Sequence, residues 1–226
     1  MPLLPLTLGV RPSSGAEVVS APKQKSLAEK ALKRDDHTCR FCGFHSEKFQ
    51  RTVPYEELDP PVATACVFCE QVLNLERAAM TGAGLLIWLP EVNQADLNHM
   101  ARAIYVARAA NDDGEKGSMA ALATRALDAL TLRRSEAKKR LGTDDPLLLA
   151  TILRESLNKQ ELKAAAGKLE GIRLLPSEKY MARGAKGDTN QFPTLAKYWA
   201  TEPYKAWPVA TWAETLKKAL AATGKA

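Results

Sequence analysis

The sequence holds only four cysteines, and they form two closely spaced pairs, Cys39-Arg-Phe-Cys42 and Cys66-Val-Phe-Cys69. Two residues between the thiols let the backbone make a tight turn that points both sulfur atoms at one position. Two such turns supply the four thiolates of a tetrahedral zinc site. Gly43 follows the first pair, where a turn of this kind often requires a positive φ angle. We therefore expect Cys39, Cys42, Cys66 and Cys69 to bind one zinc ion.

Two other uses of the cysteines compete with this interpretation. A pair of disulfides is one, but disulfides are rare in the cytoplasm, where we place the chain. Two redox-active C-x-x-C motifs are the other, but no thioredoxin-like βαβ pattern surrounds them. Four thiolates leave no open position for water or substrate, so we expect a structural zinc. Its binding would add folding free energy, on the order of 10 kcal/mol in isolated finger peptides, to the Pro-rich and charged segment 46–61.

The composition is that of a soluble globular protein. The chain has 226 residues, of which 46% are hydrophobic, so it is long enough for one large domain or two small ones. Crossing a membrane takes about 20 consecutive apolar residues, and the most apolar window, residues 78–89, is shorter and interrupted. Residues 1–10 are apolar but have no basic residue before them, unlike a secretory signal. We expect a cytoplasmic protein.

The formal net charge of +6 is mild and unevenly distributed. Lysine and arginine are concentrated in residues 23–51 and again in residues 133–140. A net positive charge permits contact with nucleic acid, acidic lipid or an acidic protein without selecting among them. These runs form either solvated helix faces or a patch for an acidic partner.

The residues around the first cysteine pair resemble one edge of the HNH endonuclease fold, in which a helix ending in Arg-Asp leads into a C-x-x-C-G turn. Here Arg34-Asp35 precede Cys39-Arg-Phe-Cys42-Gly43. An HNH nuclease then needs a histidine base between the cysteine pairs, and a His or Asn after the second pair to help hold the catalytic cation. Residues 46–65 contain neither His nor Asn, and Glu70 follows Cys69. The scaffold is therefore expected without the active site.

The three histidines do not restore that site. His45 lies too close to Cys42 to act as the base. His37 suits the C-terminal end of a helix, where the dipole favours it. His99 lies in a periodic helical stretch, and we expect a structural role for it.

The hydrophobic pattern predicts an α+β fold that is mostly helical. The cysteine spacing and the resemblance to the HNH fold imply an HNH-like four-cysteine zinc module (knuckle, strands, knuckle, helix), followed by a helical region. Asn93 and Asp145 are expected helix caps, and Gly142 an expected helix end. The expected elements are a strand at 3–10, a helix at 25–35, the module at 39–75, a strand at 84–89, helices at 93–110, 119–141, from 144 and at 159–169, an extended stretch at 171–175, a loop at 184–188 and a terminal helix at 209–221.

The expected domain organisation has four parts. Aromatic residues are concentrated in the last of them, with Trp199, Trp207 and Trp212, and such residues serve either as core or as a docking surface. The parts are an N-terminal strand or extension (1–24), the zinc module (25–92), a helical region packed on it as one domain (93–180) and a Trp-rich C-terminal extension (181–226).

Several stretches in this order are similar to one family. They are Arg34-Asp35 with Cys39-Arg-Phe-Cys42-Gly43-Phe44, Thr64-Ala65-Cys66-Val-Phe-Cys69, Gly84 to Glu91, Gln94-Ala95-Asp96-Leu97-Asn98 and Gly171 to Ser177. Together they resemble the IcmJ/DotN family of type IVB (Dot/Icm) secretion systems, over residues 25–180. The resemblance implies an HNH-like zinc fold that lacks the catalytic histidine, with Cys39, Cys42, Cys66 and Cys69 as the zinc ligands.

The resemblance also implies a role in transport. Family members are subunits of the coupling complex, cytoplasmic and peripheral to the inner membrane. The implied partners are the C-terminal extension of the coupling ATPase (DotL-like), a DotM-like subunit and IcmS/IcmW-like adaptors, and the implied role is to help recruit effector substrates. No small-molecule substrate and no enzymatic activity are expected. The alternative is a nucleic-acid-binding or HNH-type nuclease zinc protein.

Overall fold

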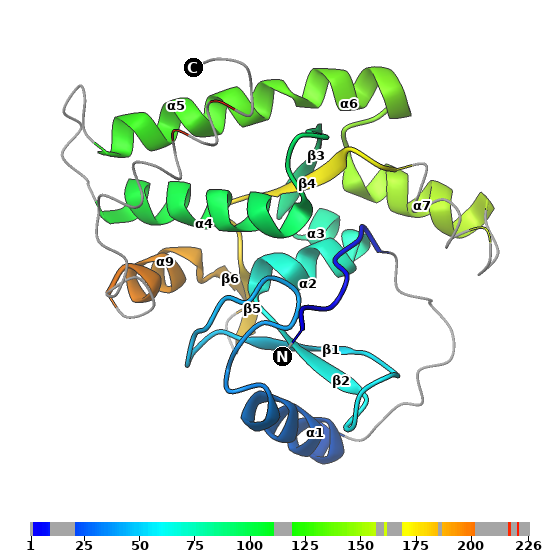
Figure 1. The fold of residues 1–226 in the computed structure, drawn as a ribbon, viewed down its shortest axis with the longest axis vertical. Helices are drawn as coiled ribbons and strands as arrows, with labels where there is room; N and C mark the ends of the chain where they lie inside the picture. The colour runs from blue at the N-terminus through cyan, green and yellow to red at the C-terminus, as the bar shows by residue number, and fades with distance from the viewer. Residues whose placement is uncertain are drawn as a thin grey trace.

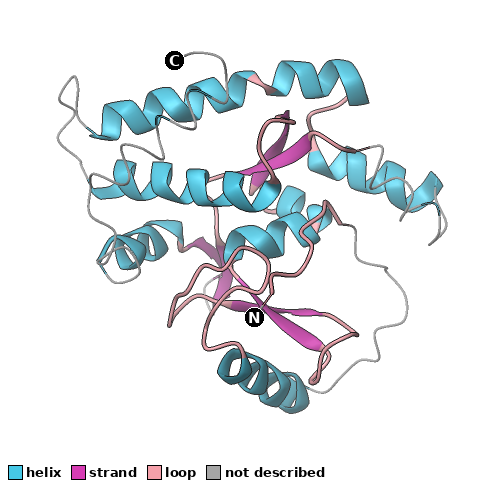
Figure 2. Cartoon of the chain, in the orientation of Figure 1, coloured by secondary structure: helices cyan, strands magenta, loops and turns pink. Residues whose placement is uncertain are grey.

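The computed structural model describes residues 2–9, 21–110, 119–156, 169–184 and 187–201, together with Glu161, Lys217 and Ala221. Helices make up most of this part of the chain (Figure 2). Its strands form three separate antiparallel ribbons of two strands each. The α+β, mostly helical fold class expected from the sequence is confirmed. None of the described helices is both long and apolar enough to span a membrane.

The cysteine-containing region follows the predicted order of elements. Helix α1 (Ala21–Arg34) leads into the first cysteine turn. Strand β1 (Arg51–Pro54) pairs with β2 (Val62–Ala65), and the second cysteine pair opens α2 (Val67–Leu73), followed by α3 (Leu75–Met80). In Figure 1 this region occupies the lower half of the molecule, with α1 beneath the β1–β2 ribbon. The prediction of knuckle, strands, knuckle and helix is confirmed.

The predicted N-terminal strand is wrong for the described residues 2–9, which have no regular secondary structure. Pro2 and Pro5 lack the backbone N–H groups that a paired strand donates, which explains the absence of a ladder. The segment instead runs past the β1–β2 ribbon to α3 (Figure 1). It is held by isolated backbone hydrogen bonds: the Leu4 amide donates to the Arg40 carbonyl (2.7 Å), the Gly9 amide donates to the Val72 carbonyl (3.0 Å), and the Leu75 amide donates to the Gly9 carbonyl (3.0 Å).

The other half of the molecule is built on a ribbon that joins distant parts of the chain. Strand β3 (Gly84–Trp88) pairs with β4 (Ile172–Pro176). Helix α4 (Gln94–Ala110) contacts β4, and also contacts α5 (Met119–Leu132) and α9 (Phe192–Thr201). Helix α6 (Arg134–Leu141) contacts β3, and α7 (Pro146–Ser156) packs on α3. The predicted strand and the predicted helix starts near Asn93 and Asp145 are confirmed.

Side chains close the outer edge of β4. The Gln94 side chain bonds both the amide and the carbonyl of Leu174, at 2.9 and 2.8 Å. Arg173 donates to the Ile172 carbonyl (2.9 Å), and the Tyr105 hydroxyl donates to the Pro176 carbonyl. An open edge would invite pairing with another chain, and these contacts remove that opportunity.

The predicted single helix over 119–141 is interrupted at Arg133. The Arg133 amide bonds the Leu130 carbonyl (3.0 Å), three residues back, which is a tighter turn than an α-helix makes. The Arg133 carbonyl also accepts from the Trp88 amide (3.2 Å). Contact with the edge of β3 thus accounts for the break, which the helical pattern alone does not show. Gly142 ends α6 with φ +77°, as predicted.

The C-terminal region corrects one further expectation. Residues 184–188 were expected to be a loop, but β5 (Met181–Gly184) pairs with β6 (Gly187–Asn190). Gly184 and Gly187 lie opposite each other at the end of this ribbon, as the flanking residues of a hairpin do. The helix predicted over 159–169 and the terminal helix over 209–221 lie almost wholly outside the described residues. Trp199 is buried in α9, and its ring lies against Phe44 and Phe68.

Candidate metal centre

The fold brings all four cysteines together in the interior. Their sulfur atoms all lie within 4.8 Å of one another, and every one of the four side chains is buried. The Cys42 and Cys66 sulfurs are 3.7 Å apart, which is too far for a disulfide. Zinc–sulfur bonds of ~2.3 Å in a tetrahedron place neighbouring sulfurs ~3.8 Å apart. The cluster therefore has the composition and the size to hold one metal ion.

The first cysteine pair owes its shape to Gly43. The Gly43 amide donates to the Cys39 carbonyl (2.8 Å), and the Cys39 amide donates to the Phe44 carbonyl (2.9 Å). Gly43 has φ +75°, as the sequence predicted. A Cβ atom there would meet nothing closer than the Leu3 side chain at 3.8 Å. Glycine is needed for its backbone angle and not for space.

The second pair lies at the beginning of α2. Cys66 is the N-cap residue, and Cys69 is in the first turn. The Cys66 carbonyl accepts the first helical bond, from the Glu70 amide at 2.9 Å. The N-terminal end of a helix carries a partial positive charge that favours thiolates. Both cysteines of this pair are therefore placed where ionisation is promoted.

Burial of the cysteines opposes the ionisation of their thiols. It raises the pKa of the Cys39 and Cys69 thiols well above the ordinary value, because a thiolate loses its hydration in the interior. Four neighbouring thiolates also repel one another. Ionisation of all four together therefore requires cationic charge within the cluster, which a divalent metal ion supplies.

One face of α4 contacts the cluster. The Asn98 side-chain amide donates to the Cys69 sulfur at 3.3 Å, and the Arg102 guanidinium donates to the Cys66 sulfur at 3.1 Å. His99 Nε2 is 2.7 Å from the Cys42 carbonyl, and Arg102 Nη1 is 3.1 Å from His99 Nδ1. A carbonyl only accepts and a guanidinium only donates, so this geometry requires a neutral His99 protonated at Nε2. His99 thus supports the first cysteine turn, as a structural histidine would.

Asn98 and Arg102 were missed by the sequence analysis. They do leave a signal, because Gln94, Asn98 and Arg102 recur at four-residue spacing on a helix flanked by Leu97, Ala101 and Ile104. Such a stripe is normally interpreted as a solvated face. Here all three side chains are buried, and Asn98 and Arg102 have 0% exposure. Only the position of the cysteine sulfurs distinguishes a solvated polar face from a buried face that contacts the cysteines.

The two histidines near the first cysteine pair and the residue after the second pair, which the sequence excluded from a nuclease site, have acidic or basic partners of their own. His37 and His45 both face Glu47, at 3.7 and 3.4 Å, on the outer side of the first cysteine turn. Glu70 is buried in α2 and pairs with Arg77 at 3.3 Å. Within the described residues, the cysteine cluster is the group whose ligand atoms come close enough to hold a metal.

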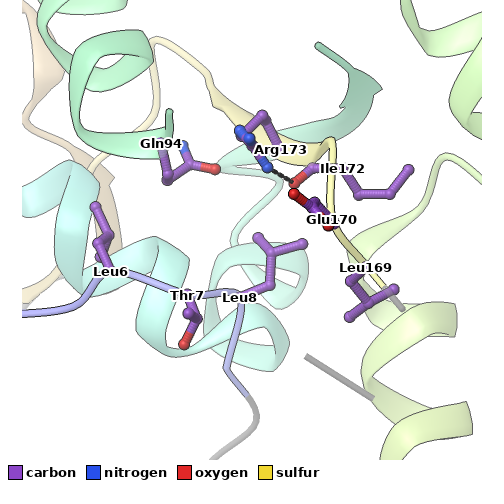
Figure 3. A pocket seen from close by; sticks show the side chains of 8 residues that line it. All are labelled: Leu6, Thr7, Leu8, Gln94, Leu169, Glu170, Ile172 and Arg173. Carbon is purple, nitrogen blue, oxygen red and sulfur yellow. Dashed lines mark hydrogen bonds between the residues drawn. The ribbon is translucent and has the colours of Figure 1, made fainter. Parts of the chain in front are cut away.

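A groove of about 390 Å³ lies beside the start of α4 (Figure 3). Two of its polar side chains have partners inside the protein: Arg173 donates to the Val92 carbonyl (2.7 Å), and Gln94 donates to the Leu174 carbonyl (2.8 Å). Gln94 lines the groove and also donates to the side-chain oxygen of Asn98, which contacts the cysteine cluster. The lining of the groove consists of Leu6, Thr7, Leu8, Gln94, Leu169, Glu170, Ile172 and Arg173.

These features define a class: a mixed α+β protein with a buried cluster of four cysteines that has the size to hold one metal ion. No protein-family model matches the chain. The chain is 33% identical over 166 residues to the type 4 apparatus protein DotN of Legionella pneumophila. The match covers 68% of this chain and 73% of that relative. The chain therefore belongs to the DotN (IcmJ) family, as the sequence motifs predicted.

Proposed function

We propose that this chain is a non-catalytic, zinc-binding subunit of a bacterial type IVB secretion coupling complex. It binds the C-terminal extension of a DotL-like coupling ATPase, alongside DotM-like and IcmS/IcmW-like subunits, and helps to recruit effector substrates. It is cytoplasmic and reaches the inner membrane through its complex. The observation that carries this proposal is the 33% identity to a protein named as a type 4 apparatus component.

The geometry of the cluster supports zinc as the metal. Cys39, Cys42, Cys66 and Cys69 would supply four soft sulfur ligands at tetrahedral spacing, the arrangement typical of structural zinc. The ion would cross-link the first cysteine turn to α2. Residues 25–92 would then form a zinc module on which residues 93–180 pack as one domain, with residues 1–24 and 181–226 as extensions.

Two observations support a non-catalytic role. Four thiolates would leave the metal no open position for water, and all four cysteines are buried. The β1–β2 ribbon, where an HNH nuclease carries its base, has no histidine, and residues 46–65 as a whole have none. The position after the second pair holds Glu70, which is paired with Arg77.

The basic run in and just before α6 is less available to nucleic acid than its charge suggests. Arg134 pairs with Asp144 at 2.6 Å, and Arg140 pairs with Glu136 at 3.0 Å. Arg133 pairs with Glu91 at 3.2 Å, just before α6 begins. Binding to phosphates requires cations that are available to replace counterions. Intramolecular pairing of these arginines reduces that availability.

The test is co-expression with the C-terminal extension of the coupling ATPase from the same organism, followed by gel filtration. We expect one peak that contains both chains in a fixed ratio. Cys66→Ser should abolish this peak, because it removes a ligand and so disrupts the cysteine region. Met80→Ser, a polar substitution at an 81% exposed position in α3, is the matched control and should leave the peak unchanged.

Separate elution of a folded, zinc-loaded chain would contradict the proposed partner. Retention on double-stranded DNA at about 50 mM salt, lost steeply as salt rises, would then favour the nucleic-acid alternative. Absence of zinc from the purified wild-type chain would contradict the proposed metal site independently of the partner.

A further inference from the structure

The two sulfurs of the second cysteine pair each receive a hydrogen bond from α4. Asn98 Nδ2 lies 3.3 Å from the Cys69 sulfur, and Arg102 Nη2 lies 3.1 Å from the Cys66 sulfur. The donors are four residues apart, so they lie on one face of the helix. The two donors therefore match the two sulfurs one to one.

We propose that Asn98 and Arg102 shield the metal-bound thiolates of Cys66 and Cys69 from electrophiles and so keep the metal centre chemically inert. The inference rests on the proposed zinc site and extends it to two residues outside the ligand set. An N–H donor withdraws electron density from a thiolate lone pair, the same electrons with which sulfur attacks a carbon or sulfur electrophile. Asn98 and Arg102 are thus positioning and protecting groups for the metal ligands.

The charge balance of the site favours Arg102 for this role. Four thiolates around a divalent zinc ion leave the centre with a net charge of −2, which is costly in the interior. The Arg102 guanidinium is completely buried, and its central carbon lies 3.8 Å from the Phe44 ring centroid. The ring centroids of Phe68 and Trp199 lie 5.5 and 5.3 Å from the same carbon. These aromatic rings favour the cation and keep water from taking its place beside Cys66.

Asn98 is fixed by a different mechanism. Gln94 donates to the Asn98 side-chain oxygen at 3.0 Å and also bonds Leu174 of β4. An amide whose oxygen is already engaged keeps its NH₂ group turned the other way. The NH₂ group therefore faces Cys69, and the orientation is anchored to a strand that lies outside the cysteine region.

The experiment is alkylation of the zinc-loaded protein with iodoacetamide at constant neutral pH. The attacking sulfur forms a bond to the methylene carbon, and iodide leaves with the electron pair. The resulting thioether is a much weaker ligand, so zinc is released and is measured with the chelator 4-(2-pyridylazo)resorcinol. Peptide mapping by mass spectrometry at early time points identifies the cysteine that reacts first.

Arg102→Met and Asn98→Leu are the test variants, and the half-buried Arg173→Met, which has no contact with the cysteines, is the matched control. A hydrogen bond to a charged group is worth enough that its loss should raise the zinc-release rate about tenfold in each test variant. We expect Cys66 to be modified first in Arg102→Met and Cys69 first in Asn98→Leu. Arg173→Met should release zinc at the wild-type rate.

Equal release rates in wild-type and test variants that each carry one zinc would overturn the inference while leaving the zinc site intact. The same first-modified cysteine in every variant would also overturn it, because general loosening has no reason to follow the hydrogen-bond pattern. If Arg102→Met does not fold, Arg102→Lys, which keeps the charge, replaces it as the test variant. We expect Arg102→Lys to release zinc at a rate between those of the wild-type protein and Asn98→Leu. Release at the wild-type rate would contradict the inference. Wild-type protein purified without zinc would overturn the proposed metal site and this inference together.

Discussion

The part of the chain that the structure describes has two cores of different composition. The core of the cysteine region surrounds the four cysteines and combines the aromatic rings of Phe44, Phe68 and Trp199 with aliphatic side chains of α4 and α5. The second core, around β3, β4, α3 and α7, is aliphatic and includes Leu86, Leu149 and Leu174. The strands of the first region are four residues long and flank a proline-rich connection. Around the β1–β2 ribbon, the proposed metal ion would add stabilisation that these short strands do not provide by themselves.

Removal of the metal should have the largest effect on stability, and it should affect the cysteine region more than the aliphatic core. Cys66→Ser, or treatment with a strong chelator, should remove on the order of 10 kcal/mol of binding free energy from the cysteine region. Hydrogen exchange should show loss of protection at the β1–β2 amides, while the β3–β4 amides stay protected. Simultaneous loss of protection in both ribbons would show that the two cores unfold as one unit.

Truncation of a side chain in the aliphatic core should lower the stability of that core and leave the cysteine region unaffected. Leu174 is fully buried in β4, and Leu174→Ala should lower the free energy of unfolding by about 2–5 kcal/mol. The zinc content should stay at one ion per chain, because the cysteines are held by other contacts. Denaturant melts with metal analysis measure both quantities, and loss of zinc at low denaturant would contradict the separation of the cores.

Asp35 gives the cysteine region a pH dependence of its own. Its side chain is fully buried and accepts hydrogen bonds from Arg34 (2.8 Å), Arg40 (3.2 Å) and the Thr64 amide (3.0 Å). Burial alone raises the pKa of this carboxyl, but the hydrogen bonds outweigh burial and lower the pKa to about 2. The lowered pKa means that the carboxylate stabilises the fold above its unfolded pKa of about 4 and stops doing so as the pH falls toward 2.

The test compares Asp35→Asn with the wild-type protein across this pH range. The difference in unfolding free energy should be about 2 kcal/mol near neutral pH and should disappear between about pH 4 and pH 2. Metal loss in acid affects both proteins and therefore cancels in the difference. A difference that persists unchanged down to pH 2 would show that the Asp35 charge is not what stabilises the contact.

The smallest effect should come from the cap of α4. Asn93 Oδ1 accepts the Asp96 amide at 2.8 Å, and its side-chain NH₂ donates to the Asp96 carboxylate at 2.7 Å. Asn93→Ala should cost about 1 kcal/mol in thermal or denaturant unfolding. The zinc-release rate should not change, because Asn98 and Arg102 lie further along the helix. A faster rate would show that the helix start controls the metal centre.

Local sequence signals predicted much of the fold. The C-x-x-C spacing, Gly43 and the caps Asn93 and Gly142 each express chemistry within a few residues, and the structure brings them where expected. The break at Arg133 and the β5–β6 ribbon depend on contacts or pairing that helical periodicity does not contain. The N-terminal segment was misjudged because its apolar residues outweighed Pro2 and Pro5.

The grouping of the four cysteines was predictable from the sequence, whereas the residues that surround them were not. Cysteines at fixed spacing can be recognised in the sequence, whereas Asn98 and Arg102 are ordinary polar residues on a helix. Their role depends on where α4 crosses α2, and that crossing is set by packing across the whole molecule. The donors to Cys66 and Cys69 therefore became visible only in three dimensions.

Native mass spectrometry of the chain co-purified with the C-terminal extension of the coupling ATPase measures the metal and the partner together. We expect a complex that carries one zinc ion per chain and dissociates when a chelator removes the metal. A metal-loaded chain that never carries the partner, or a complex that persists after the zinc is gone, would contradict this expectation.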